Sequence, residues 1–191
     1  ADGTVINKTK AQELIDDVIL NSGHDLLENY ADLFSVENEN SIESVFEIQY
    51  SEKASWGDWN WRVGSEGNQA VILYGIRDIS EATGYATGWS FAPVSSSFVN
   101  EFDTGDPRLS ASVIDLTSFE DKNGDGLPEG QLNGVNAEYR PGFQNTGYFN
   151  KKFQPLIANN PEDGSRELNY PNNYPAIRFA DVLLMGAELY L

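Results

Sequence analysis

The 191-residue chain has no cysteine, one histidine and one methionine. The absence of cysteine excludes disulfides, thiolate nucleophiles and cysteine-ligated metals, and it is compatible with either a reducing cytosol or a bacterial cell surface. Since His24 is the single histidine, we expect a solvated turn residue there rather than a metal cluster. No apolar run is long enough to span a membrane. The chain opens on Ala-Asp-Gly without a signal peptide, so we expect a processed or excised piece.

Basic residues are also scarce. Twelve Lys and Arg stand against 30 Asp and Glu, which gives a formal net charge of −18. A field of that sign repels a phosphate backbone, so nucleic acid is excluded as a partner and a neutral ligand is favoured over a polyanionic one. A hydrophobic content of 40% and an aromatic content of 12% are typical of a globular protein.

Hydrophobic periodicity predicts helices and strands along the whole chain. Apolar residues recur at helical spacing over residues 9–21 and again over 26–34, which together indicate a helical hairpin. Ser95 or Ser96 can cap a short helix that ends near Phe102. Alternating apolar residues or short apolar runs predict three strands. These are residues 39–50, 70–76 and 109–116.

The C-terminal stretch, residues 173–191, is predicted to be one helix with Pro175 in its first turn. Arg178, Asp181 and Glu188 form one narrow polar stripe, and the remaining faces are almost wholly apolar. A helix of this kind must be buried by neighbours on several sides. We expect some of those neighbours to lie in sequence outside this chain.

Three tryptophans crowd into the glycine-rich stretch 51–68, which indicates a loop rather than a regular core element. An indole face stacks on the C–H face of a sugar ring, and interleaved polar side chains can hydrogen-bond its hydroxyls. The alternative is that the loop folds back and the rings pack into the core. The predicted ligand-binding residues are Trp56, Trp59, Trp61, Asp58, Asn60 and Arg62.

Residues 121–132 copy the first part of an EF-hand-type calcium loop. The twelfth position is Leu132 rather than glutamate, so a remote carboxylate would have to replace the usual bidentate ligand. The same residues can also form a metal-free, Asx-rich turn. The candidate calcium ligands are Asp121, Asn123, Asp125, Leu127 and Glu129.

Ile-Arg-Phe-Ala-Asp-Val-Leu-Leu-Met-Gly-Ala-Glu (177–188) resembles a signature of the SusD/RagB family, the surface glycan-binding lipoproteins of Bacteroidota. The family pattern has a bulky residue where this chain has Gly186. Segments 22–34, 39–50 and 88–108 resemble further family motifs in the same order.

The third of these segments contains Trp89 and the triplet Asp106-Pro107-Arg108. We expect Trp89 to be structural, the triplet to form a turn, and Arg108 to pin it through an ion pair.

The resemblance implies a mainly α-helical fold with irregular loops and a few short strands. Such proteins combine a tetratricopeptide-like α-α superhelix with a ligand-binding cap. This chain would be a central-to-C-terminal part truncated at both ends, with a hairpin at 1–35, an irregular ligand-facing region at 36–172 and a helix at 173–191 that re-enters the repeats.

The resemblance also implies a function. The parent would be an outer-membrane lipoprotein on the external face, active in nutrient uptake and polysaccharide utilisation. It would bind a neutral oligosaccharide or polysaccharide without catalysis and deliver it to a SusC-like TonB-dependent transporter. No cofactor would be required, apart from the candidate calcium.

Two other classes remain open from the residues alone. A glycoside hydrolase needs only two suitably spaced carboxylates, and 30 acidic residues could supply them. The 121–132 loop would also suit a calcium-stabilised structural or adhesion module.

Overall fold

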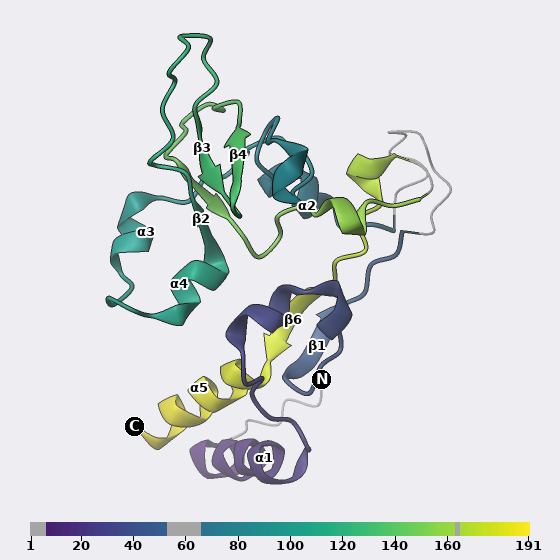
Figure 1. Ribbon diagram of the computed structural model, residues 1–191. Helices are drawn as coiled ribbons and strands as arrows, with labels where there is room; N and C mark the ends of the chain where they lie inside the picture. The colour runs from purple at the N-terminus through teal and green to yellow at the C-terminus, as the bar shows by residue number, and fades with distance from the viewer. Residues whose placement is uncertain (1–6, 53–65, 163–164) are drawn as a thin grey trace.

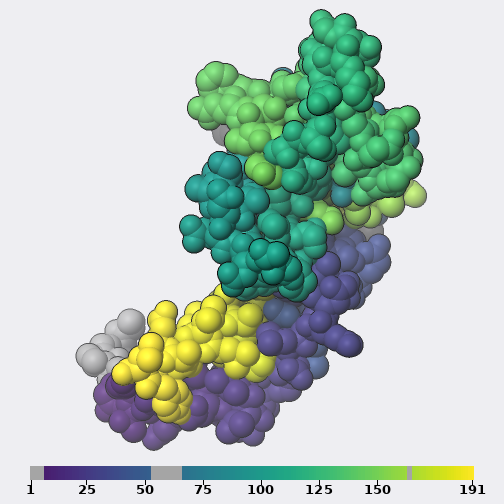
Figure 2. Space-filling view, turned by 60° about the vertical axis from the view of Figure 1, so that its left-hand side comes forward, coloured from purple at the N-terminus to yellow at the C-terminus, as the bar shows by residue number. Residues whose placement is uncertain are grey.

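A computed structural model describes residues 7–52, 66–162 and 165–191, which form two parts arranged one above the other (Figure 1). The stem, residues 7–52 and 173–191, contains both the first and the last helix. The head contains the described residues between 66 and 172. The space-filling view shows the purple and yellow stem beneath the teal and green head (Figure 2). The chain therefore leaves the stem after its first strand and returns to it at the end.

Short elements joined by irregular segments make up both parts. The α-helices are α1 (Lys8–Asn21), α2 (Gln69–Tyr74), α3 (Ser96–Asn100), α4 (Pro107–Ser112) and α5 (Phe179–Tyr190). The strands are β1 (Ser44–Ile48), β2 (Val113–Asp115), β3 (Glu129–Leu132), β4 (Val135–Glu138), β5 (Tyr148–Asn150) and β6 (Tyr174–Arg178). The 3-10 helices are Tyr30–Phe34, Val36–Asn38, Glu81–Thr83, Ile157–Asn159 and Arg166–Leu168. The strands pair as β1 with β6, β2 with β5 and β3 with β4, all antiparallel. No helix in the described ranges is long and apolar enough to cross a membrane.

In the stem, α1 packs against α5, the two helices at opposite ends of the chain (Figure 1). Gly186 lies at this contact, where an added Cβ would come within 3.1 Å of Ile15 and 3.3 Å of Ile19. The small residue therefore permits the close approach of the two helices. Tyr190 closes the far end by donating its hydroxyl to the Asp16 carboxylate at 2.5 Å.

The junction between β6 and α5 is fixed by a buried carboxylate. Glu43 is 3% exposed, and its Oε2 accepts a hydrogen bond from the Leu27 N–H at 2.9 Å. Its Oε1 lies 3.4 Å from Arg178 Nη1, and its backbone carbonyl accepts from the Phe179 N–H at 2.8 Å. The Arg178 N–H donates in turn to Asp181 Oδ2 at 2.9 Å, which caps α5. One ion pair thus joins the loop before β1 to the start of the last helix.

The head holds the main hydrophobic core, built around the β2–β5 pair. Tyr139 stacks edge-on with both Phe119 and Phe149, and these rings close the core. Burial of so much aromatic and branched aliphatic area is the main stabilising term for this part. The fully packed cluster consists of Ile76, Ile79, Tyr85, Ile114, Leu116, Phe119, Ala137, Tyr139 and Phe149.

Several elements predicted from sequence are confirmed. The first helix, predicted over 9–21, begins one residue earlier because Asn7 Oδ1 accepts from the Lys10 N–H at 2.9 Å. Ser95 caps α3, with its Oγ accepting from the Phe98 N–H at 3.2 Å. The strand predicted within 39–50 is β1.

Of two strands predicted in the head, one is wrong and the other is confirmed only in its second half. Residues 70–76 form α2, because a short apolar run fits a buried helix as well as a strand, and Asn68 caps it through its side-chain oxygen. Residues 109–116 divide between α4 and β2, because Pro107 occupies the first helical position and Asp106 is the N-cap.

The prediction of a helix from 173 onward is wrong for its first turn. Tyr174–Arg178 is strand β6, in which Pro175 lies opposite Glu47 of β1, and the helix begins only at Phe179. A residue before proline favours extended backbone, which agrees with the strand. The second helical stretch predicted at the N-terminus is reduced to the 3-10 helix Tyr30–Phe34, and α1 packs on α5 instead.

Candidate functional site

The predicted glycan-binding residues fall outside the described part of the chain. These are Trp56, Asp58, Trp59, Asn60, Trp61 and Arg62. The structure does describe the two ends of the segment that contains them. The Ser51 N–H donates to the Glu66 carbonyl at 2.9 Å, and Asn68 N–H donates to the Tyr170 carbonyl at 2.8 Å. Ser51 and Glu66, which flank the segment, therefore lie side by side, and Asn68 is held against the last part of the head.

The candidate calcium loop lies at the end of the head farthest from the stem (Figure 1). The Asp121 carboxylate accepts backbone hydrogen bonds from Gly124 at 2.7 Å and from Gly126 at 3.0 Å. Asp125 accepts from the Leu127 N–H at 2.9 Å. These contacts are those of an Asx-rich turn, and they also occupy lone pairs that a calcium ion would use.

The remaining candidate ligands that we consider in this loop are Glu129 and Asn123. Glu129 exchanges two backbone hydrogen bonds with Glu120, and this pairing closes the loop at its base. The side chain of Asn123 makes no hydrogen bond to any described residue. Across the described ranges, no group of three or more histidine, aspartate or glutamate side chains is arranged to hold a metal. The calcium ligand set stays a prediction.

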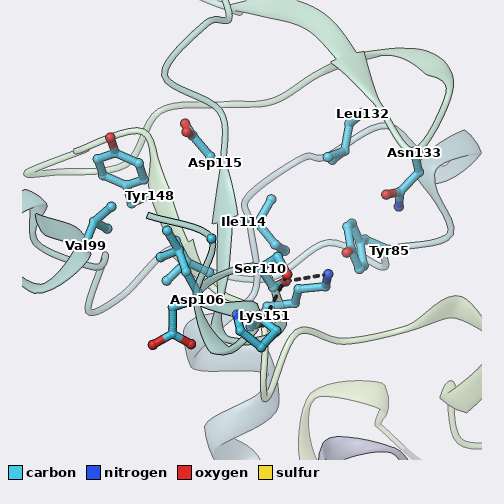
Figure 3. A pocket seen from close by; sticks show the side chains of 14 residues that line it. Tyr85, Val99, Asp106, Ser110, Ile114, Asp115, Leu132, Asn133, Tyr148 and Lys151 are labelled. Atoms are coloured by element: carbon cyan, nitrogen blue, oxygen red, sulfur yellow. Dashed lines mark hydrogen bonds between the residues drawn. The ribbon is translucent and has the colours of Figure 1, made fainter. Parts of the chain in front are cut away.

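A cavity of about 580 Å³ lies between α4, the β2–β5 pair and the β3–β4 turn (Figure 3). Its volume is in the range of small-molecule sites. Figure 3 shows Tyr148 and Val99 on one side and Tyr85, Leu132 and Asn133 on the other. The lining residues are Tyr85, Val99, Gly105, Asp106, Pro107, Leu109, Ser110, Val113, Ile114, Asp115, Leu132, Asn133, Tyr148 and Lys151.

The polar groups of this cavity are already hydrogen-bonded within the protein. The Lys151 ammonium donates to the Ser110 carbonyl at 2.8 Å, which is a dashed line in Figure 3. Asp115 accepts from the N–H and the hydroxyl of Thr117 at 2.9 and 2.6 Å. Asn133 donates to a backbone carbonyl at 2.8 Å. The cavity therefore offers mainly apolar surface and few free polar groups.

A second, smaller pocket of about 300 Å³ is lined by aromatic rings, and we call it the aromatic pocket. Trp89 and Phe91 lie edge to face with ring centres 6.0 Å apart. Phe143 is 89% exposed, an unusual state for a side chain of its kind. The lining residues are Arg77, Trp89, Ser90, Phe91, Ala92, Pro93, Gly142, Phe143 and Gln144.

The backbone around the aromatic pocket is strained. Ser90, Ala92 and Gln144 have φ values of 56°, 52° and 59°, in the left-handed region that favours glycine. Each such residue costs on the order of 1–2 kcal/mol. Strain of this kind persists only where the surroundings hold it, and it gathers at binding sites.

Comparison with known proteins identifies the family of the chain. The model of the SusD family matches residues 42–190. The chain belongs to the SusD family. A SusD-like protein of Bacteroides ovatus is 27% identical over 187 residues, which are 95% of this chain and 30% of that protein.

Solved structures of SusD-like proteins share the fold. A laminarin-binding SusD-like protein matches with a TM-score of 0.80 and 32% identity, over 96% of this chain and 40% of that one. Surface glycan-binding protein A from Bacteroides thetaiotaomicron, in complex with laminarihexaose, matches with a TM-score of 0.77 and 26% identity, over 96% and 39% of the two chains. The chain therefore spans less than half the length of each of these relatives.

The SusD-family motifs noted in the sequence prove to be structural in this fold. Arg178 forms the ion pair that joins β6 and α5 to the loop before β1. Arg108 lies 2.6 Å from the Asp106 carboxylate, so the predicted ion pair is confirmed, although the triplet begins a helix rather than a turn. Trp89 packs against the buried cluster of Val71, Ile72 and Tyr170, as expected.

His24 is half-buried and hydrogen-bonds the Ile42 carbonyl at 2.9 Å, so it is more than a solvated residue.

Asp106 of the large cavity and Glu39 of a smaller one do not suit the role of catalytic acid in glycoside hydrolysis. Asp106 and Asp115 both line the large cavity, but hydrogen bonding from Arg108 lowers the pKa of Asp106, whereas a catalytic acid needs a raised pKa. Burial and the charges of Glu47 and Glu37 raise the pKa of Glu39. Glu39 lines a cavity of only about 10 Å³, which is room for one water molecule and not for a sugar ring.

Sequence reasoning missed the aromatic pocket. Its members come from three separate segments around residues 77, 89–93 and 142–144. Only residues 89–93 belong to a family motif, and Trp89 in that motif was expected to be structural. Left-handed backbone at Ser90, Ala92 and Gln144 gives no signal in sequence because none of the three is glycine. The nearest signal was Phe143, a large apolar residue between Gly142 and Gln144 in an otherwise polar stretch.

Proposed function

We propose that the chain is part of a non-catalytic cell-surface protein that binds a neutral oligosaccharide or polysaccharide. The observation that carries this proposal is the match in fold and family to a surface glycan-binding protein in complex with laminarihexaose. The match covers nearly the whole chain, so the comparison concerns the same elements in the same order.

We propose that the tryptophan segment supplies the main glycan contact. The described residues on either side of it are joined by the hydrogen bond between Ser51 and Glu66, which supports a site at this place in the fold. Three indole rings within six residues would give adjacent stacking surfaces for successive sugar rings. The formal net charge of −18 favours neutral glycans for this contact.

We further propose that the full-length protein is a lipoprotein on the external face of the outer membrane. It would pass its glycan to a SusC-like TonB-dependent transporter. Membership in the SusD family supports both statements. Co-purification of the transporter with a tagged full-length protein, and its loss when the lipid attachment is removed, would test them together.

Alanine at Trp56, Trp59 or Trp61 should weaken oligosaccharide binding by the full-length protein. Loss of one stacked ring removes the aromatic contact and buried apolar area, about 2 kcal/mol in all, or roughly a thirtyfold lower affinity. Isothermal titration calorimetry with laminarihexaose is the measurement. The melting temperature should stay nearly unchanged.

Trp89→Ala is the control for lost packing, because Trp89 contacts a buried cluster and its removal should lower the melting temperature. If all three loop variants bind as the wild type does, or melt as Trp89→Ala does, the segment is not the glycan contact. If the glycan is cleaved during the titration, the protein is a glycoside hydrolase and not a non-catalytic binding protein.

If the 121–129 loop holds calcium, a chelator should lower the melting temperature and added calcium should restore it. Binding at a hundredfold excess over Kd would stabilise the folded state by about 2.7 kcal/mol. Asn123→Ala should reduce this difference, because it removes a ligand without breaking any hydrogen bond that the loop makes among the described residues.

Asp121→Ala is the comparison, since it also removes the backbone hydrogen bonds that hold the turn. It should lower the melting temperature with or without the metal. A wild-type melt that does not respond to chelator would identify a metal-free turn.

A further inference from the structure

The aromatic pocket contains a cation that has no ion-pair partner among the described residues. The Arg77 N–H donates to Ser90 Oγ at 2.8 Å, and its carbonyl accepts from the Arg140 N–H at 2.9 Å, so its backbone is fixed. Its guanidinium makes no hydrogen bond or ion pair to any described residue. The neighbouring Asp78 carboxylate is held by Arg140 instead, at 2.6 Å. Arg77 is half-buried and lines the pocket.

This lack of a partner is notable in a chain where acidic residues outnumber basic ones, 30 to 12. An arginine side chain here could have been paired by almost any neighbouring acid. The guanidinium presents five donors in a planar fork, which matches the two oxygens of a carboxylate. The pocket therefore has an unused site for a planar anion.

The walls of the pocket suit a sugar ring. Phe91 is 53% exposed and Phe143 is 89% exposed, so both rings offer open apolar faces. The side-chain amide of Gln144 makes no hydrogen bond to a described residue and can serve a hydroxyl. The positive φ values of Ser90, Ala92 and Gln144 indicate that the surrounding structure fixes the backbone of these walls.

The larger cavity lacks these properties. Its lysine, aspartates and asparagine are each hydrogen-bonded within the protein, so a ligand there would have to displace an existing contact. At the aromatic pocket, Arg77 and Gln144 are available without any such cost. The two sites thus differ in the ligand chemistry that they favour.

We propose that the aromatic pocket binds a carboxylated sugar, a hexuronate residue of a glycan. The carboxylate pairs with the Arg77 guanidinium, and the apolar ring face packs against Phe91 and Phe143. This inference rests on the proposed glycan binding and adds a second, charge-selective site to it.

The test is calorimetric titration of the full-length protein with a trimer of galacturonate and with the same trimer fully methyl-esterified. The acid should bind and the neutral ester should bind far more weakly. Arg77→Ala should weaken binding of the acid by roughly ten- to hundredfold, as expected for loss of a charged hydrogen-bonded pair. Phe143→Ala should weaken both trimers.

Arg140→Ala is the matched control. It removes the same charge from the same surface, but Arg140 does not line the pocket, so binding of the acid should change less than twofold. Arg77→Gln keeps the apolar stem of the side chain and should bind as weakly as Arg77→Ala while melting as the wild type does.

Equal weakening by Arg77→Ala and Arg140→Ala would overturn the proposal, as would equal binding of acid and ester or no binding of the acid. Laminarihexaose, titrated in parallel, reports the neutral-glycan function separately. Its binding should not change in Arg77→Ala. If the wild-type protein does not bind laminarihexaose, the proposed neutral-glycan function is contradicted. The galacturonate titration still tests the aromatic pocket in that case.

Discussion

Replacing Arg178 with alanine should destabilise the protein by about 3–5 kcal/mol, because it leaves the Glu43 carboxylate buried without its counter-charge. The Glu43 side chain is 4% exposed and keeps only the Leu27 N–H as a hydrogen-bond donor after this change. The three segments that meet there are the loop before β1, strand β6 and helix α5. Chemical denaturation of the full-length protein would measure the loss.

Arg108→Ala is the matched control for this experiment. Arg108 also pairs with a carboxylate, but its side chain is 63% exposed, so the loss of this solvent-screened pair should destabilise the protein much less. The double variant Arg178→Met, Glu43→Gln should recover much of the loss, because it removes both charges and keeps an acceptor for Leu27. If Arg178→Ala costs no more than Arg108→Ala, the buried pair does not stabilise this junction.

Gly67→Ala should also cost several kcal/mol. A Cβ at this position would lie 2.2 Å from the Leu168 carbonyl oxygen and 2.3 Å from the Asn169 Cα, both backbone atoms that cannot turn aside. Overpacking of this kind costs about 1–3 kcal/mol and sometimes more. Because Gly67 lies next to the base of the tryptophan segment, the variant should also bind glycan more weakly.

Gly23→Ala provides the comparison. Gly23 has φ +80° and open space around it, so alanine there should cost only about 1 kcal/mol of backbone strain and should leave glycan affinity unchanged. Equal effects of the two substitutions on stability and affinity would mean that the contact between residue 67 and residues 168–169 is not tight.

The elements that the sequence predicted well are those that local chemistry determines. Helix α1 has apolar residues at helical spacing and a polar cap, and α3 begins at a serine whose hydroxyl binds a free N–H. The SusD-family signature was also recognisable, because Arg178 and Asp181, whose contacts fix the start of α5, lie in one short segment.

The errors occur where a distant segment decides the local structure. Tyr174–Arg178 pairs with β1, more than a hundred residues earlier, and this pairing overrides a pattern that otherwise fits a helix. The apolar run of α2 is helical because Asn68 caps it and residues 166–170 pack beside it. No local pattern states which distant segment will be the partner.

The candidate sites, too, could be predicted from sequence only where their residues are contiguous. The 121–129 loop was recognisable because its polar residues are contiguous, although its carboxylates bind backbone N–H groups. The aromatic pocket was not recognisable, because Arg77, Phe91 and Phe143 are brought together only by the fold.

The pairing of β1 with β6 has a consequence for how this protein can diversify. Ile48 and Tyr174 lie opposite each other in the two strands, so the chain leaves the stem and re-enters it at neighbouring points. An insertion whose ends are held this closely can be lengthened, shortened or exchanged at little entropic cost to the part that carries it. Parts of the head that do not touch the stem can therefore change in length without disturbing the β1–β6 pair, whereas α4 and Lys152, which contact the 3-10 helix Tyr30–Phe34, are constrained by the stem.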